Sequence, residues 1–264
     1  MKKFVIVGTQ RTGSSALAES IGMHPSVACG WEWSLRVPWR HKLLAAKRGL
    51  EGDFSLLMDH ERQHMERIFS EQTCWIGYRS LFRASDKWLV SPRFSAALFA
   101  DRFNDHLAWF KSQRDLHIIH IVRYDNIEWL KSKFISQAAN AYVGKEYPED
   151  LKVTVPLGAS VKRLQSKAWV DDQLANLGTS NPYLRVRYED LLADRTGVLC
   201  EALRFLALDP AGVDVGQATL FRQSTGDASR YISNYNELRL ALEALQLLTS
   251  RLGSTPSSAR PGAA

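Results

Sequence analysis

The N-terminal segment FVIVGTQRTGSS, residues 4–15, combines an apolar run, a glycine-bounded loop and the first turn of a helix. The apolar run at residues 5–7 is typical of a strand buried on both faces. Gly8 and Gly13 bound the loop and allow backbone conformations that a Cβ atom would forbid. A helix is predicted from Ser14 to about residue 24. The segment therefore predicts a strand–loop–helix unit at the start of an α/β fold.

This loop has the features of an anion-binding site. It directs several backbone N–H groups at one point, and the N-terminus of the following helix adds positive potential there. Its spacing is close to the Walker A pattern of phosphate-binding loops, but Ser14 stands where that pattern has its lysine, and the cation lies within the loop as Arg11. We therefore expect an anion site unlike that of an ATPase. The alternative is an ordinary strand–turn–helix with a surface arginine.

The composition favours one globular domain with anionic ligands. We expect a single α/β domain over residues 1–253 and a disordered tail over 254–264, STPSSARPGAA. The net charge of +6 favours nucleotides, acidic sugars or a membrane surface, but it is too mild to indicate nucleic acid. The three cysteines form no CxxC pair, which predicts neither a structural zinc site nor a disulfide framework and favours a reducing, cytoplasmic setting. No apolar run approaches the length of a membrane span.

Strand and helix patterns alternate along the chain. Further strands are predicted at 26–29, 74–82, 116–123 and 183–188, and most of the segments between them read as helices. This alternation predicts a mainly parallel sheet flanked by helices on both faces. Three helix starts are predicted from capping residues, and they are Asp125 or Asn126, Ser160 for a helix to about 177, and Asn236 for a last helix to about 251. A further helix is predicted over 191–206, with Asp190 as a cap at the preceding corner.

A second polar signal lies at the end of the strand 116–123. Arg123 is at its carboxyl end, and Ser132 follows nine residues later, about two turns into the next helix. Ligands of open α/β sheets bind at the carboxyl ends of the strands, so both side chains are expected near the glycine loop. An arginine and a hydroxyl suit a second phosphate. The alternative is a surface arginine and a solvated serine.

Together these signals resemble the sulfotransferase family that uses 3′-phosphoadenosine-5′-phosphosulfate as its donor. VGTQRTGSSALAESIGMHPSV, residues 7–27, is similar to the family's 5′-phosphosulfate loop. IIHIVRYDNIEWLKSKFIS, residues 118–136, is similar to its 3′-phosphate segment, with an arginine-to-serine gap one residue longer than usual. VRYEDLLADRTGVLCEALRFLAL, residues 186–208, resembles its YEDL strand–helix unit, and FRQSTGDASRYISNYNEL, residues 221–238, resembles the loop before the last helix of bacterial members.

The resemblance implies a P-loop-like sulfotransferase architecture and a set of donor-binding residues. Sulfuryl transfer would run in line to a hydroxyl or amine acceptor, with Arg11 stabilising the charge on the leaving group and no metal ion required. The implied donor contacts are Arg11, Thr12, Gly13, Ser14 and Ser15 for the 5′-phosphosulfate, Arg123 and Ser132 for the 3′-phosphate, and Arg222 and Gln223 for the phosphate or adenine.

Glu32 is the candidate general base. It lies between Trp31 and Trp33, and apolar walls raise the pKa of a carboxyl group toward the range in which it exchanges a proton near neutral pH. Several bacterial and carbohydrate sulfotransferases carry a glutamate at a similar place after their second strand. The alternatives are an ordinary surface glutamate between two core tryptophans, and His24 as the base.

The acceptor is not readable from the sequence. The segments 34–73 and 144–180 match no motif, and a glycan, a lipid or another hydroxylated molecule all remain possible acceptors. Two other functions stay open, which are a P-loop-type small-molecule kinase and a nucleotide-binding protein without sulfotransferase activity. A kinase would need a lysine in the loop and a Mg²⁺-binding acid at a strand end, and neither is evident.

Overall fold

The computed structural model describes residues 2–29, 75–82, 107–108, 110–139, 147–148, 150–213 and 227–248. Its strands are β1 (Lys2–Thr9), β2 (Val27–Cys29), β3 (Trp75–Phe82), β4 (His117–Val122) and β5 (Tyr183–Arg187). Its α-helices are α1 (Ser14–Gly22), α6 (Asn126–Ala138), α7 (Leu157–Ala175), α8 (Tyr188–Ala193), α9 (Arg195–Phe205), α10 (Ala228–Tyr231) and α11 (Tyr235–Ala244). The described residues also include the 3₁₀ helices η1 (Asn176–Thr179) and η2 (Pro210–Gly212).

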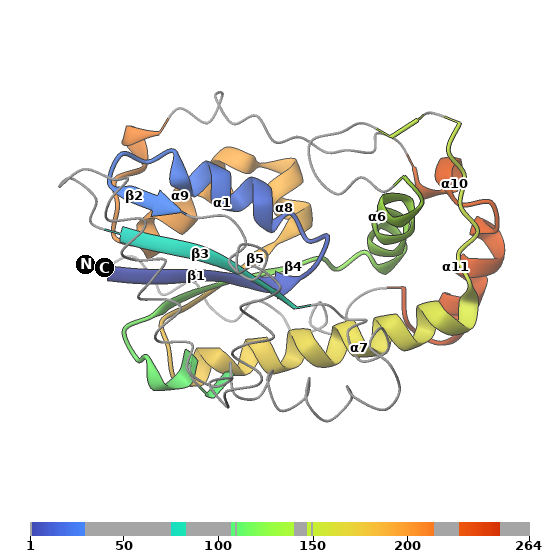
Figure 1. Ribbon diagram of the computed structural model, residues 1–264, viewed down its shortest axis with the longest axis horizontal. Helices are drawn as coiled ribbons and strands as arrows, with labels where there is room; N and C mark the ends of the chain where they lie inside the picture. The colour runs from blue at the N-terminus through green and yellow to red at the C-terminus, as the bar shows by residue number, and fades with distance from the viewer. Residues whose placement is uncertain are drawn as a thin grey trace, which may run out of the picture.

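The strands form one parallel sheet in the order β2-β3-β1-β4-β5. β1 is the central strand, between β3 and β4, and its carboxyl end leads into the glycine loop and α1 (Figure 1). The change of direction in strand order, from β3 on one side of β1 to β4 on the other, creates the crevice in which such sheets bind ligands. The predicted α/β fold with a mainly parallel sheet is confirmed.

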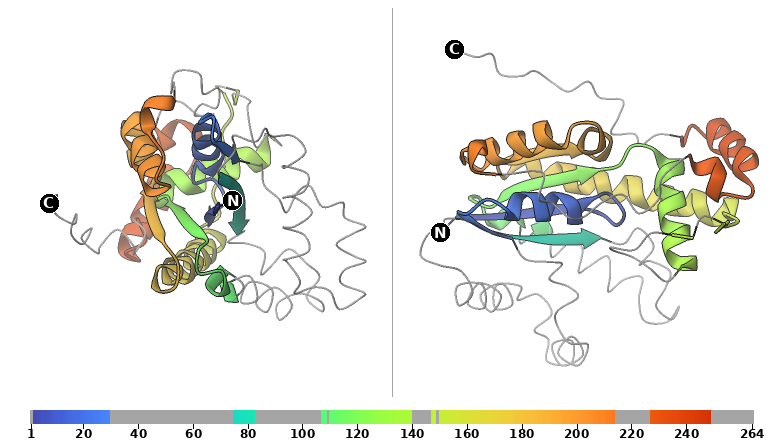
Figure 2. Two further views of the ribbon diagram at one scale, coloured as in Figure 1. Left: turned by 90° about the vertical axis from the view of Figure 1, so that its left-hand side faces the viewer. Right: turned by 90° about the horizontal axis from the view of Figure 1, so that it is seen from above.

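Alternate residues of β1 face two different layers of helices. Phe4 and Ile6 are fully buried in a core shared with α1 and α9, whereas Val5 and Val7 are fully buried in a core shared with α7. Figures 1 and 2 show α1, α8 and α9 on one face of the sheet and α7 along the other. Each such side chain contributes about 1.5–3 kcal/mol through burial, so the apolar run at the start of the chain anchors both layers.

A third core lies beyond the carboxyl ends of the strands. It joins α6, α10 and α11 to the first half of α7, and Trp129, Leu164 and Leu238 are among its buried residues. Figure 1 shows these helices gathered past the ends of β1 and β4. The third core therefore holds α6 in front of the glycine loop.

Several predicted helix boundaries are wrong. Ser160 lies inside α7 rather than at its start, because its hydroxyl donates to the Pro156 carbonyl four residues back and Pro156 is the N-cap. The helix predicted over 191–206 is two helices, since Asp194 interrupts it and caps α9 by accepting from the Gly197 N–H at 2.8 Å. The last helix starts after Asn234, not at Asn236, and ends at Ala244, because a residue with positive φ, Gln246, follows its C-cap.

A polar cluster is enclosed between β4, β5 and α7. His120 is fully buried, and its Nδ1 lies 2.6 Å from the Tyr183 hydroxyl. On the opposite side of its ring, Nε2 is 3.8 Å from Oδ1 of Asp171, and Oδ2 of Asp171 accepts from Lys167 at 2.8 Å. Burial lowers the pKa of His120, opposed by the nearby Asp171, and burial also raises the pKa of Tyr183 to about 12. His120 is therefore neutral in the folded chain at neutral pH.

We expect His120 to make the fold sensitive to acid. Because its folded pKa lies below the ordinary value of 6.5, the unfolded chain binds a proton that the folded chain does not. Its contribution to stability is present above pH 6.5 and is lost as the pH falls toward the folded pKa, by up to about 1.4 kcal/mol per pH unit. Urea denaturation between pH 7.5 and 5.5 measures this slope.

The variant His120→Gln should flatten that slope, whatever its effect on stability at pH 7.5. His117→Gln is the matched control for the replacement itself, because this side chain is partly exposed on the same strand. Equal slopes for His120→Gln and the wild type would contradict the assignment.

Candidate functional site

The two glycines of the loop are required by close packing. Gly13 has φ 82°, and a Cβ atom there would lie 2.6 Å from Cδ2 of Tyr188, the first residue of α8. A Cβ atom on Gly8 would lie 2.6 Å from the Ile121 carbonyl oxygen of β4. The loop therefore lies against β4 and against α8, the helix that follows β5, and any larger residue at either position would push it away from them.

Arg11 adopts a conformation that is uncommon for a non-glycine residue. Its φ is 69°, in the left-handed region. The Thr12 hydroxyl donates to the Thr9 carbonyl at 2.8 Å and closes the turn from inside. The Arg11 carbonyl accepts a hydrogen bond from Nη1 of Arg123 at 3.3 Å. A residue held in a strained conformation at a strand end is a common feature of ligand sites.

The N-terminus of α1 faces the interior of the same loop. Gly13 is its N-cap, so no side chain of that residue caps the helix, and the first turn contains no acidic residue. Ser14 is buried and Ser15 is partly buried at the first two helical positions. Because the N–H groups at a helix start bind anions, this arrangement is suited to a phosphate or sulfate group.

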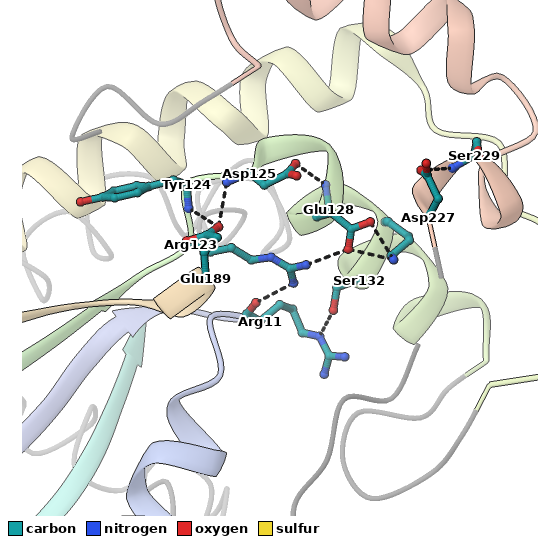
Figure 3. A network of polar contacts seen from close by, with 10 residues as sticks. Arg11, Arg123, Tyr124, Asp125, Glu128, Ser132, Glu189, Asp227 and Ser229 are labelled. Carbon is teal, nitrogen blue, oxygen red and sulfur yellow. Dashed lines mark hydrogen bonds and ion pairs between the residues drawn. The ribbon is translucent and has the colours of Figure 1, made fainter. Parts of the chain in front are cut away.

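The Arg11 side chain reaches across the crevice to α6 and to the segment beyond it. Its Nε donates to the Ser132 hydroxyl at 2.9 Å, and its Nη2 donates to the Tyr147 hydroxyl at 2.9 Å. Figure 3 shows Arg11 directed at Ser132. The structure thus brings Arg11 together with Arg123 and Ser132, which lie more than 100 residues after it in sequence.

Arg123 is almost fully buried at the end of β4. Its guanidinium lies 4.4 Å from the centre of the Tyr188 ring, and its Nη2 is 3.1 Å from Oε2 of Glu128. Burial lowers the pKa of Arg123, and the neighbouring Tyr188 and Glu128 oppose that shift. An arginine remains charged in proteins under such shifts, so the site holds a fixed positive charge in a region that excludes water.

Lys131 adds a second buried cation beside Glu128. Its Nζ lies 2.9 Å from Oε1 and 2.8 Å from Oε2 of that carboxylate, and 5.4 Å from the centre of the Tyr231 ring. Arg123, Glu128 and Lys131 therefore form a cation–carboxylate–cation cluster with a formal charge of +1. Figure 3 shows the contact between Glu128 and the guanidinium of Arg123.

Two carboxylates secure the turn between β4 and α6. Oε1 of Glu189 accepts from the N–H groups of Tyr124 and Asp125, at 2.9 and 3.0 Å. Asp125 caps α6 by accepting from the Glu128 N–H at 2.8 Å, which confirms one of the two predicted caps. Burial is the main cause of a raised pKa at Asp125. Asp190, by contrast, is not a cap, because it lies within the first turn of α8.

Gln10 ties the loop to α6 at two further points. Its carbonyl accepts from the Trp129 indole N–H at 2.8 Å, and its side-chain oxygen accepts from Nζ of Lys133 at 2.8 Å. The loop is therefore held against α6 by Gln10 as well as by Arg11. Trp129 and Lys133 belong to no motif of their own. In the sequence they are related only by the helix they share, where they follow Asn126 by three and seven residues.

Three predicted site residues, Glu32, Arg222 and Gln223, lie outside the described residues. His24, the rival base, is buried beyond the end of α1, and its Nδ1 accepts from the Ser26 N–H at 3.1 Å.

Within the described part of the chain, no group of three or more His, Cys, Asp or Glu side chains is placed to hold a metal ion. No helix in that part is long and apolar enough to cross a membrane.

Gly13→Ala should destabilise the protein, because it forces a Cβ atom into the left-handed region and into the Tyr188 ring. We expect the free energy of unfolding to fall by about 1–3 kcal/mol from the backbone strain alone. Gly158→Ala is the matched control, since a Cβ atom at this helical glycine meets nothing within 4 Å. Urea denaturation compares the two. A loss at Gly13 no greater than at Gly158 would show that the loop can move away from α8 without cost.

Comparison with known proteins identifies the family. No curated protein sequence matches the chain significantly. Similar solved structures include the sulfotransferase domain of the Synechococcus PCC 7002 olefin synthase, with 17% identity, a TM-score of 0.45, and coverage of 98% of this chain and 90% of that chain. A sulfotransferase from Alicyclobacillus acidocaldarius has 14% identity, a TM-score of 0.47, and coverage of 93% and 94%. A sulfotransferase from Mycobacterium tuberculosis H37Rv has 12% identity, a TM-score of 0.42, and coverage of 92% and 75%.

A model of the sulfotransferase family matches residues 3–211. The match includes the glycine loop, Arg123, α6 and the strand–helix unit that contains Tyr188. It covers well over half of the sequence, and the chain therefore belongs to the sulfotransferase family.

Proposed function

We propose that this sulfotransferase moves a sulfuryl group from 3′-phosphoadenosine-5′-phosphosulfate to a hydroxyl or amine acceptor, without a metal ion. The observation that supports this donor is the meeting of two cationic centres at the end of β1. Arg11 extends from the anion loop, and Arg123 contacts the backbone of the same residue from the end of β4. A donor with one phosphate at each end of its ribose suits such a pair.

The 5′ half of the donor would occupy the loop. The backbone N–H groups of residues 11–15 and the start of α1 bind its phosphosulfate, with Arg11, Thr12, Gly13, Ser14 and Ser15 as the contact residues. The bond between sulfur and the bridging oxygen breaks as the bond to the acceptor oxygen or nitrogen forms, and negative charge develops on the bridging oxygen. Arg11 stabilises that charge. Ser132 and Tyr147 hold its guanidinium by two hydrogen bonds, so little reorganisation accompanies the reaction.

The 3′ half would occupy the start of α6. Arg123 binds the phosphate through charge-assisted hydrogen bonds, and the Ser132 hydroxyl donates a further one while it accepts from Arg11. Arg222 and Gln223 add contacts to the phosphate or the adenine. A serine that bonds to Arg11 and also to the 3′-phosphate links the two ends of the donor.

Glu32 would accept the proton that the acceptor loses during transfer. It follows the last residue of β2 by three positions in the sequence, and the carboxyl end of β2 lies at the same edge of the parallel sheet as the loop. A sulfuryl group carries less charge than a phosphoryl group, so the loop and Arg11 suffice without a divalent cation.

A glycan, a lipid or another hydroxylated molecule would serve as acceptor. The proposal includes a reducing, cytoplasmic setting for the enzyme.

Donor binding is tested first with adenosine 3′,5′-bisphosphate, adenosine 5′-phosphate and ATP–Mg²⁺ in calorimetric titrations. The wild type should bind the bisphosphate best. Arg123→Ala should reduce the preference for the bisphosphate over the 5′-phosphate by about 10–100-fold, the value of a hydrogen bond to a charged group. Arg239→Ala, at an exposed arginine of α11, is the control. A preference for ATP–Mg²⁺ would favour the kinase, and equal losses for both adenosine nucleotides would remove Arg123 from the 3′-phosphate site.

The base is tested with Glu32→Gln, His24→Gln and the control Glu237→Gln, which lies on an exposed turn of α11. Turnover is measured as release of adenosine 3′,5′-bisphosphate, with an acceptor found by screening with labelled donor. We expect Glu32→Gln to lower kcat by about 10²–10⁴-fold and to leave bisphosphate affinity unchanged. A loss of turnover in His24→Gln alone would transfer the role to His24. Binding without turnover in the wild type would support a non-catalytic nucleotide-binding protein.

A further inference from the structure

Arg123 has one guanidinium edge on which only one of the two nitrogen atoms has a hydrogen-bond partner among the described residues. Nη1 donates to the Arg11 carbonyl, and Nη2 lies 3.1 Å from Oε2 of Glu128. Nε is buried and has no hydrogen-bond partner among the residues that the structure describes. Nε and Nη2 form the edge with which an arginine grips a carboxylate or a phosphate by two parallel bonds. Glu128 therefore occupies half of a two-point anion site.

Lys131 explains why Glu128 does not take both positions. Its Nζ contacts both carboxylate oxygens, at 2.9 and 2.8 Å, from the next turn of α6. The carboxylate thus lies between two cations, and its side chain is 17% exposed. Because Lys131 can retain Glu128 without help from Arg123, the contact with Arg123 can be given up while the carboxylate keeps a charged partner.

We infer that Glu128 is a displaceable counter-ion of Arg123 and a determinant of donor specificity. It occupies Nη2 when no nucleotide is bound, and it withdraws to Lys131 when a phosphate takes the edge formed by Nε and Nη2. The inference rests on the proposed function in one respect, which is that this phosphate is the 3′-phosphate of the donor.

The consequence is that Glu128 weakens the binding of the 3′-phosphate. Each bound phosphate has displaced a carboxylate, and the displaced carboxylate remains close enough to repel it. The same competition favours release of the adenosine bisphosphate product, since the counter-ion returns to Arg123 as the phosphate leaves. If Glu128 instead served only to orient Arg123, its removal would weaken phosphate binding.

The test uses the double variant Glu128→Gln, Lys131→Met. Removal of both charges keeps the formal charge of the cluster at +1, so a change in affinity does not arise from the net potential. Arg123 keeps its hydrogen bond to the Arg11 carbonyl. The matched control is Glu243→Gln, Arg239→Met, which removes an exposed ion pair of α11. A second variant, Glu128→Asp, keeps the pair with Lys131 and draws the carboxylate away from Arg123.

Calorimetric titration with adenosine 3′,5′-bisphosphate, adenosine 5′-phosphate and inorganic phosphate reads the result. We expect the double variant to bind the bisphosphate about 5–50-fold more tightly than the wild type, and Glu128→Asp to show a smaller gain of the same sign. Affinity for adenosine 5′-phosphate should be unchanged in both, and the control should match the wild type. Unchanged or weaker bisphosphate binding in both variants would overturn the inference.

Failure of the proposed donor gives a different pattern. In that case neither the wild type nor the control prefers the bisphosphate over the 5′-phosphate. Inorganic phosphate then serves as the probe of Arg123, and the double variant should still bind it more tightly than the wild type. Equal phosphate affinities in the two proteins would overturn the counter-ion role itself.

Discussion

The hydrogen bond from Nη1 of Arg123 to the Arg11 carbonyl connects the two halves of the site. It joins the end of β4 to a loop residue with positive φ, and so it helps to hold a conformation that a free chain would rarely adopt. The contact is possible because β1 and β4 are neighbours in a parallel sheet, which places both carboxyl ends at one edge. This contact holds the backbone of Arg11, while Ser132 and Tyr147 hold its side chain.

Tyr188 supports both partners of that hydrogen bond. Its ring packs against Gly13 and lies under the guanidinium of Arg123. It belongs to the strand–helix corner after β5, where the next residue, Glu189, accepts two backbone hydrogen bonds from the turn that follows Arg123. One corner of the chain therefore fixes the loop from one side and the arginine from the other, which gives the YEDL unit a physical role in the site.

The buried cations at the end of β4 and on α6 each have an acceptor within the protein. Arg123, Lys131 and Lys133 are all buried, and each contacts a carboxylate or amide oxygen of the protein. Buried cations without partners would strongly destabilise the fold, so these internal acceptors are needed before a ligand binds. A phosphate that binds there, as we propose, would have to compete with these acceptors.

The sequence by itself determined the sheet, the anion loop and the likeness to sulfotransferases, because an apolar run, two glycines and an arginine at a strand end are local features. It also indicated Arg11, Arg123 and Ser132 as site residues, and the structure brings these three together. Only the tertiary structure revealed Tyr147 as a partner of Arg11 and Glu128 as a partner of Arg123, since neither belongs to a local pattern that marks a site. The contact of Lys131 with Glu128, and those of Gln10 with α6, were revealed in the same way. Helix boundaries at Ser160 and Asp194 were also decided there. Capping residues recur along any chain, and packing selects which of them starts a helix.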